Sequence, residues 1–208
     1  MLIGFVDAPP YSFLDRNQQP AGQLIDVFKV IATELKLTPE FIYVPHKRQL
    51  AFIEQGMVDL WAGQKDSRVS SDLALTSEKP LFVMELSVFW PDGGIPVGSF
   101  EHLKGKHLIL ISSYSYGGRF EALVNGAANV SYAINHEDAL DKLHQFPAAY
   151  MLGYSSITKQ LQQKYQLDAV KQHALDRIPL FAKLSTQFAN AEQTIIEINA
   201  VLASLESQ

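Results

Sequence analysis

The stretch His107-Leu-Ile-Leu-Ile111 decides the fold, because an alternation of strands and helices that has already run once along the chain begins again there. Its apolar, β-branched composition is typical of a buried strand. Beyond it we expect helices at 117–126, 136–146 and 157–165, with strands at 130–134 and 148–152. This order predicts a β-α-β-α-β unit with a parallel sheet.

The first part of the chain carries the same alternation. We expect strands at 2–6, 41–44 and 58–62, and helices at 24–35 and 50–56. Near the C-terminus, Ile195, Ile198, Leu202 and Leu205 follow helical spacing and form one apolar stripe. If that helix packs on the first unit, the chain crosses between two units twice, at 82–91 and at 178–184. Two crossings between two α/β lobes predict a hinge, with a ligand site in the cleft between them.

Composition excludes several classes of protein. The 208 residues include no cysteine and carry a net charge of -5, so thiol catalysis, disulfides and a dominant nucleic-acid partner are not expected. No run of 18 apolar residues predicts a membrane span. We find no histidine cluster spaced for a metal and no catalytic motif, so we expect no metal, no cofactor and no enzyme activity. Met1 is followed directly by a strand, as in a trimmed exported protein behind an added Met or in a native cytosolic one.

Five segments in order resemble one family. They are Ile3-Gly-Phe-Val with Pro10-Tyr-Ser-Phe13, Gly22-Gln-Leu-Ile-Asp26, Gly56-Met-Val-Asp59, Ala62-Gly63 and Leu103-Lys-Gly-Lys106. Together they resemble the periplasmic solute-binding proteins of family 3, which are polar amino-acid receptors of ABC importers. The resemblance covers almost the whole chain in the right order, and this chain is identified as a divergent member.

The resemblance implies a type II periplasmic binding protein with two Rossmann-like lobes joined by a two-strand hinge. Lobe 1 would hold residues 1–87 plus 185–208, lobe 2 would hold 92–179, and the hinge would lie at 88–91 and 180–184. It also implies a periplasmic, exported monomer that captures a small polar or acidic molecule and serves an ABC-transporter permease. The alternatives are the ligand-sensing input domain of a signalling protein and a dehydratase-like enzyme using a cleft acid such as Asp7.

The chain departs from the family pattern where an amino acid would bind. Ser70 stands at the place of the family's carboxylate-binding Arg, with Arg68 two residues earlier, and Lys65 replaces a Ser or Thr. Gly153 occupies the place of the Asp that holds the α-amino group. A desolvated ammonium needs such a partner. We therefore expect an acid without an amino group or a small cyclic metabolite, unless Asp7 or Asp138 reaches the site.

The candidate ligand residues follow from the strand ends and from the resemblance. They are Tyr11, Phe13, Arg48, Gly63, Lys65, Arg68, Ser113, Tyr114, Ser115, Tyr116 and Tyr150. An Arg offers a carboxylate two parallel hydrogen bonds, and hydroxyl groups at a helix start suit ligand oxygens. The alternative interpretations are a core position for Phe13, a surface role for Arg48, an ion pair for Arg68, and an ordinary N-cap for one serine.

Overall fold

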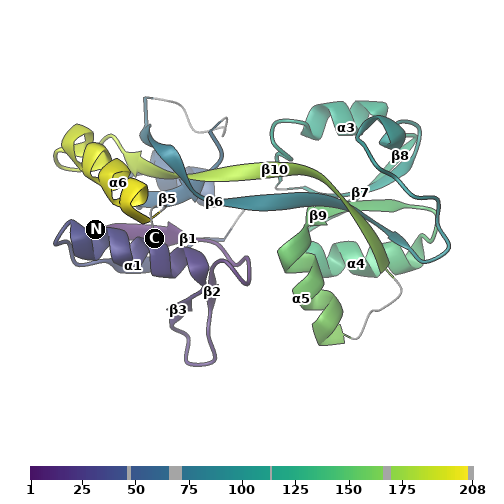
Figure 1. The fold of residues 1–208 in the computed structure, drawn as a ribbon, viewed down its shortest axis with the longest axis horizontal. Helices are drawn as coiled ribbons and strands as arrows, with labels where there is room; N and C mark the ends of the chain where they lie inside the picture. The colour runs from purple at the N-terminus through teal and green to yellow at the C-terminus, as the bar shows by residue number, and fades with distance from the viewer. Residues whose placement is uncertain (46–47, 66–71, 113, 166–169, 206–208) are drawn as a thin grey trace. The chain divides into compact units, whose positions relative to one another are not determined.

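A computed structural model describes residues 1–45, 48–65, 72–112, 114–165 and 170–205. The chain divides into two units: unit 1 comprises Met1–Val83 and Pro179–Gln208, and unit 2 comprises Met84–Ile178. Two long strands, β6 (Ala74–Pro91) and β10 (Val170–Ser185), carry the chain from one unit to the other and back (Figure 1).

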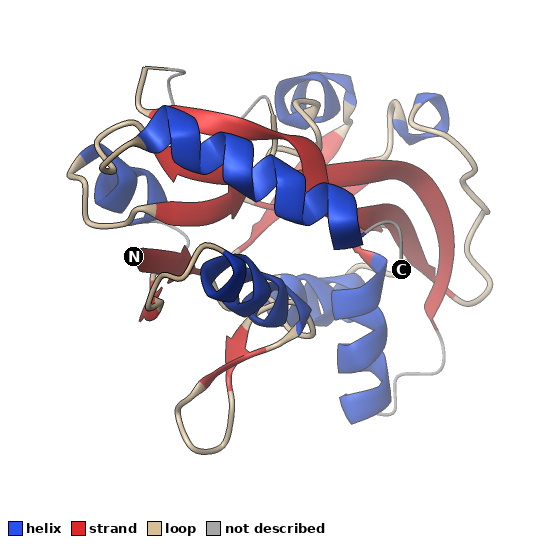
Figure 2. Ribbon diagram, turned by 60° about the vertical axis from the view of Figure 1, so that its left-hand side comes forward, coloured by secondary structure: helices blue, strands red, loops and turns tan. Residues whose placement is uncertain are grey.

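Unit 1 is built on strands in the order β4, β1, β5, β10. β1 (Leu2–Phe5) runs parallel to β4 (Glu40–Tyr43) and to β5 (Leu60–Gly63), while β10 runs antiparallel to β5. The helices of this unit are α1 (Gln23–Glu34), α2 (Gln49–Glu54) and α6 (Ala191–Leu205). α1 and α6 lie side by side in both views (Figures 1 and 2). The predicted parallel strands linked by helices are confirmed here.

A cluster of buried apolar side chains forms part of the core of unit 1. Trp61 of β5 is fully buried, as expected for a residue inside a strand, and packs with Val44, Ile53 and Val58. Helix α1 begins after Gly22, which has a φ of 111°. Glycine adopts this conformation readily because it has no Cβ. A Cβ on Gly22 would lie 2.5 Å from the carbonyl oxygen of Tyr11, so the absence of a side chain lets the loop after β1 pack against the start of α1.

Unit 2 repeats the arrangement with strands in the order β6, β9, β7, β8. β7 (His107–Ile111) runs parallel to β8 (Asn129–Ala133) and to β9 (Tyr150–Tyr154), and β6 runs antiparallel to β9. The helical segments are η2 (Glu101–Leu103), α3 (Phe120–Gly126), α4 (His136–Gln145) and α5 (Ser155–Tyr165). α4 packs on all three parallel strands and on α5. The core between α4 and the strands includes Ile109, Ile111, Leu140, Leu143 and Met151.

Two local features differ from the sequence prediction. Helix α3 begins at Phe120 rather than at residue 117, because Tyr116, Gly117 and Gly118 have φ values of 52°, 66° and 80°. Three successive left-handed residues cannot continue into a right-handed helix. A short hairpin of β2 (Phe13–Leu14) and β3 (Pro20–Ala21) was also not predicted; its two-residue strands are too short for a periodic pattern to show.

Candidate functional site

Ligands of parallel α/β sheets approach the carboxyl ends of the strands. In unit 1, Gly63 is the last residue of β5, and the segments that follow the strand ends carry Tyr11, Phe13, Arg48 and Lys65. In unit 2 the segment after β7 carries Tyr114, Ser115 and Tyr116. Arg68 and Ser113, which we also predicted as ligand residues, lie outside the described residues.

The aromatic pair after β1 packs within unit 1. Tyr11 is 7% exposed and stacks on Phe82, with ring centroids 4.7 Å apart and an interplanar angle of 10°. Phe13 is half-buried in the hairpin, where it pairs with Ala21. Most of the Tyr11 ring is therefore committed to packing, and Phe13 keeps the larger accessible surface of the two.

The end of β5 carries two lysines rather than one. Lys183 of β10 is buried, and its ammonium donates to Thr76 Oγ1 at 2.8 Å and to the carbonyl oxygen of Lys65 at 3.3 Å. The exposed Lys65 ammonium lies 5.8 Å from the centre of the Phe181 ring. A Cβ on Gly63 would lie 3.2 Å from Lys183 Cγ, so the glycine at the strand end makes room for the lysine stem. Two lysine side chains therefore lie near the end of β5.

Sequence reasoning missed Lys183, although a signal was present. A lysine interrupts the apolar run Leu180-Phe-Ala-Lys-Leu184. A charged side chain within a buried strand is costly unless it is paired or serves a function. Lys183 lies in the strand that returns to unit 1, so it was a candidate either for pairing with another polar group or for a functional role.

Arg48 and Asp7 lie at the other strand ends of unit 1. Arg48 is exposed and precedes α2, where its backbone N–H donates to the carbonyl oxygen of Pro45 at 2.7 Å. Asp7 follows β1, and partial loss of solvent raises the pKa of its carboxyl group. The arginine thus has an exposed guanidinium beside a helix start, and the aspartate holds its proton to a higher pH than usual.

Tyr116 and Tyr150, which we predicted as ligand residues, are both buried in unit 2. Tyr116 is fully buried; its hydroxyl accepts from the Ile111 N–H at 2.6 Å and donates to the Leu152 carbonyl oxygen at 3.5 Å. Tyr150 begins β9, away from the carboxyl end of the strand, and donates to the Ile95 carbonyl oxygen at 3.0 Å. Burial raises the pKa of both phenols. Both residues therefore form hydrogen bonds within unit 2.

Tyr114 is the predicted aromatic residue that keeps partial exposure in unit 2. Its ring lies 5.1 Å from the Tyr154 ring and 5.4 Å from the His136 imidazole, and both contacts are tilted. Its hydroxyl lies 3.3 Å from His136 Nδ1. Ser115 is half-buried, and its carbonyl oxygen accepts from the Phe120 N–H at 3.1 Å. The loop after β7 thus contains a partly exposed phenol whose hydroxyl is hydrogen-bonded to a histidine.

His136 has a defined protonation state. The backbone N–H of Tyr154 donates to His136 Nε2 at 3.0 Å, so Nε2 carries no proton and the neutral ring bears its proton on Nδ1. That Nδ1–H is the donor toward the Tyr114 hydroxyl. Burial lowers the pKa of His136 to about 3, which keeps the imidazole neutral at physiological pH. Sequence reasoning missed this residue, since only its place after a capping asparagine marked it.

Gly153 makes room for the His136 ring. A Cβ at this position would lie 3.0 Å from His136 Cδ2 and 3.1 Å from Nε2. It would also lie 3.0 Å from Met151 Cε. The place where the family resemblance leads one to expect a carboxylate is therefore filled by a neutral imidazole from α4.

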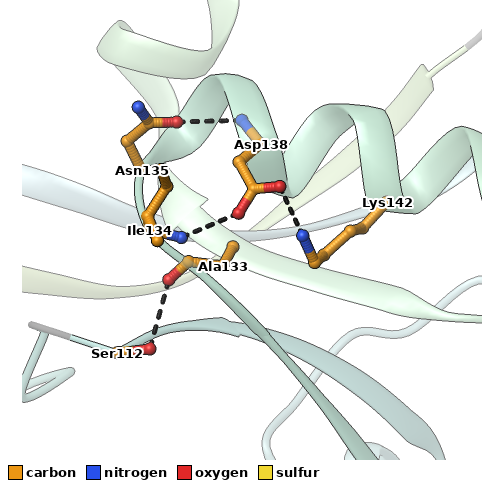
Figure 3. A network of polar contacts seen from close by, with 6 residues as sticks. All are labelled: Ser112, Ala133, Ile134, Asn135, Asp138 and Lys142. Atoms are coloured by element: carbon orange, nitrogen blue, oxygen red, sulfur yellow. Dashed lines mark hydrogen bonds and ion pairs between the residues drawn. The ribbon is translucent and has the colours of Figure 1, made fainter.

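A polar network fixes the start of α4, which carries His136. The Asn135 side chain accepts from the Asp138 N–H at 2.9 Å, and Asp138 accepts from the Ile134 N–H at 2.9 Å. Ser112 at the end of β7 donates through its hydroxyl to the Ala133 carbonyl oxygen at 3.3 Å. Figure 3 shows these contacts together with the ion pair between Asp138 and Lys142. The network ties the ends of β7 and β8 to the helix.

Asp138 is one of the two acids that the sequence offered as partners for an amino group. The hydrogen bond from Lys142, followed by that from Ile134, lowers its pKa. Its carboxylate therefore stabilises the start of α4. Among the described residues, no group of His, Asp and Glu side chains is arranged to hold a metal ion. None of the described helices is long and apolar enough to cross a membrane.

Comparison with known proteins agrees with the resemblance predicted from the sequence. Residues 2–83 match the family of bacterial extracellular solute-binding proteins, family 3. No curated protein sequence matches the chain.

Solved structures share the fold over nearly the whole chain. A histidine kinase sensor domain with similarity to periplasmic binding proteins is 17% identical, with a TM-score of 0.83 over 99% of this chain and 89% of that one. An ancestral arginine-binding protein bound to arginine is 19% identical, with a TM-score of 0.79 over 100% and 92% of the two chains. A histidine-bound ABC uptake transporter substrate-binding protein from Streptococcus pneumoniae is 18% identical, with a TM-score of 0.77 over 99% and 86%. The predicted fold class of type II periplasmic binding proteins is confirmed.

Proposed function

We propose that this chain is a divergent family 3 protein that captures a small polar or acidic solute outside the cytoplasm and delivers it to an ABC importer. The observation that carries this proposal is the family match over residues 2–83, within a chain whose fold likeness to an arginine-binding protein and an ABC transporter substrate-binding protein extends over 99% of its length or more. The family and the fold are those of binding proteins, so the proposed role is capture without turnover, by a monomer.

The chemistry of the strand ends supports a ligand other than a standard α-amino acid. At the end of β5, Lys183 and Lys65 supply positive charge that favours an anion and repels an ammonium. At the end of β9, the neutral His136 ring fills the space beside Gly153. An α-amino group brought there out of water would meet an imidazole in place of a carboxylate.

The input domain of a signalling protein is the second candidate. It is favoured by the likeness to a histidine kinase sensor domain, which has a TM-score of 0.83. Solute capture is common to both candidates. They differ in whether the captured solute is handed to a permease or triggers a signal.

A thermal-shift screen of the full chain tests solute capture. The panel contains the twenty amino acids, dicarboxylates, amines and aromatic acids. A solute present at 100 times its Kd stabilises the folded chain by about 2.7 kcal/mol, which raises the melting temperature measurably. We expect acids to give the largest shifts. Melting temperatures that stay constant across the whole panel would contradict solute capture.

Uptake measurements separate transport from sensing. Cells that carry the gene and cells from which it is deleted are compared for accumulation of the radiolabelled form of a hit. Loss of uptake on deletion supports the importer. Unchanged uptake together with loss of a transcriptional response to the same solute would favour the sensor.

A further inference from the structure

Glu85 is an exposed charged residue in the largely apolar part of β6 that runs from Leu81 to Trp90. Among the residues that the structure describes, no lysine or arginine forms an ion pair with it. Its hydrogen bonds come from two serines of the same unit that are almost fully buried, Ser87 and Ser155. Two buried hydroxyl groups are therefore directed to the one charged group of this segment.

The two serines hold one oxygen atom of the Glu85 carboxylate. Ser155 Oγ donates to Oε1 at 2.7 Å, which uses its single hydroxyl hydrogen. In the 2.6 Å contact between the two serine hydroxyls, Ser87 is therefore the donor, and its Oγ also lies 3.4 Å from Oε1. Hydrogen bonds that point the same way along such a chain strengthen one another. Oε1 is thus held in place, while none of the described residues donates to Oε2.

The carboxylate lies at the carboxyl end of β9, which is the edge of a parallel sheet that ligands approach. β6 pairs antiparallel with β9, and Ser87 stands opposite Gly153. Ser155 is the first residue after β9 and begins α5. Side chains two positions apart on a strand share one face of the sheet, so Glu85 and Ser87 lie on the same face. The sequence offers no acid within β9, and the tertiary structure supplies one from β6.

A carboxylate in this position recognises a hydrogen-bond donor. It has no hydrogen of its own to offer, so Oε2 binds only a group that brings one. A solute carboxylate placed there is repelled by the like charge, whereas a hydroxyl or an ammonium group gains a charge-assisted hydrogen bond. Burial lowers the pKa of His136, beside Gly153, to about 3, so this ring is neutral and does not offset the negative charge.

We infer that Glu85 is a specificity-determining residue of the solute site: its carboxylate, held by Ser155 and Ser87, selects solutes that carry a hydroxyl or an ammonium group over analogues that lack this donor. The inference rests on the proposed function and narrows the solute class to acids that also carry a hydrogen-bond donor. Ser155 and Ser87 do not contact the solute. They position the carboxylate that does.

Calorimetry of the full chain with two matched pairs of compounds tests the selection. Malate is compared with succinate, and γ-aminobutyrate with butyrate. The first member of each pair carries a hydroxyl or an ammonium group that the second lacks. We expect the donor-bearing member of at least one pair to bind at least about 10-fold more tightly than its analogue. Equal or tighter binding of the analogue in every pair that binds would overturn the inference.

Substitutions of Glu85 test the carboxylate and identify the kind of donor. Glu85→Leu removes both oxygen atoms, so the preference within a pair should fall about 10-fold or more. Glu85→Gln keeps an acceptor oxygen without the charge, so the preference for a hydroxyl should stay within about threefold of the parent and the preference for an ammonium should be lost. Glu121→Gln alters an exposed glutamate of α3 in the same unit, and this control should change the preference less than about twofold. An unchanged preference in Glu85→Leu contradicts the inference.

Ser155→Ala tests the positioning of the carboxylate. Without the hydroxyl, Oε1 loses its shortest hydrogen bond, so the preference should fall about threefold or more. Ser155→Thr keeps a hydroxyl and should stay within about twofold of the parent. A general loss of stability weakens both members of a pair equally, so the ratio of their dissociation constants is the readout. A ratio that Ser155→Ala leaves unchanged would remove Ser155 from this role, and circular dichroism confirms that each variant is folded.

The outcomes separate this inference from the proposed function. A chain that binds the analogues as tightly as the donor-bearing compounds overturns the inference and leaves solute capture standing. If none of these compounds binds and another member of the wider panel does, the Glu85 variants are titrated with that solute. Equal affinity of Glu85→Leu and the parent then overturns the inference. A chain that binds no solute of either set overturns both.

Discussion

In both units a glycine at or near the end of a strand makes room for a basic side chain, but the lysine in unit 1 donates through its ammonium and the histidine in unit 2 is neutral. In unit 1, Gly63 closes β5 and a Cβ there would lie 3.2 Å from the stem of Lys183. In unit 2, Gly153 lies near the end of β9 and a Cβ there would lie 3.0 Å from the ring of His136. Each glycine makes room for a buried basic side chain that comes from another element.

The two side chains differ in residue type and in hydrogen-bond partners. Lys183 donates to the oxygen atoms of Thr76 and Lys65. Burial lowers the pKa of His136 and keeps its ring neutral, and its Nε2 accepts from the Tyr154 N–H. A glycine near a strand end therefore admits a side chain that donates hydrogen bonds in unit 1 and a neutral ring that accepts a backbone N–H in unit 2.

Gly153→Asp has the largest expected effect, because it tests whether position 153 has room for a side chain beside His136. The new Cβ would lie 3.0 Å from an imidazole that is engaged at both nitrogens, so the ring has to shift, and the carboxylate is buried beside it. We expect the free energy of unfolding to fall by about 3–5 kcal/mol, measured by urea denaturation. Gly98→Asp is the matched control, because Gly98 is exposed and its nearest neighbour would lie 3.8 Å from the new Cβ.

A double-mutant cycle identifies the cause of that loss. Combining Gly153→Asp with His136→Ala should recover about 1 kcal/mol or more relative to the sum of the single effects, because the close contact with the imidazole is removed. Strict additivity would show that the imidazole is not what excludes a side chain at position 153.

Lys183→Met tests whether the Lys183 ammonium near the end of β5 contributes to binding of an acidic solute. Methionine keeps the length of the stem and removes the charge, so binding of an acidic probe from the thermal-shift panel should weaken about 30-fold, or about 2 kcal/mol. Lys29→Met, on the exposed face of α1, is the control and should leave the affinity unchanged. Equal affinities for parent and Lys183→Met would place the anion elsewhere.

Tyr116→Phe tests whether the loop after β7 depends on its buried phenol. Removing the hydroxyl takes away the acceptor of the Ile111 N–H, and the buried donor then costs about 1–2 kcal/mol of folding stability. Tyr132→Phe should cost less than about 0.5 kcal/mol, because Tyr132 is 50% exposed. Identical stability of Tyr116→Phe and the parent would mean that this hydrogen bond contributes nothing.

His136 contributes to the pH dependence of stability between pH 6 and 5. The unfolded chain titrates this residue near 6.5, whereas in the folded chain its pKa is about 3. Below pH 6.5 the unfolded state therefore binds a proton that the folded state does not. Stability should fall by about 1 kcal/mol per pH unit between pH 6 and 5, above the range of most carboxyl groups. His136→Asn should flatten this slope, and a slope that persists in the variant would assign it to other groups.

The sequence determined the alternation of strands and helices and the resemblance to solute-binding proteins. Hydrophobic periodicity and turn residues act locally, so β1, α1, β4, β7, β8 and α4 could be predicted close to their observed bounds. The departure at Gly153 was also visible in the sequence, and with it the expectation that a standard amino acid is not the ligand.

Only the tertiary structure decided what stands beside that glycine and where each tyrosine points. Lys183 and Gly63 are 120 positions apart in the chain, and His136 reaches Gly153 from a different element, so no local pattern brings these pairs together. Tyr114 and Tyr116 are neighbours of the same type in one loop, yet one is half-exposed and the other is fully buried. The left-handed backbone at Tyr116 turns its ring into the core, and that turn depends on the room and hydrogen-bond partners that β7 and β9 provide once they are packed.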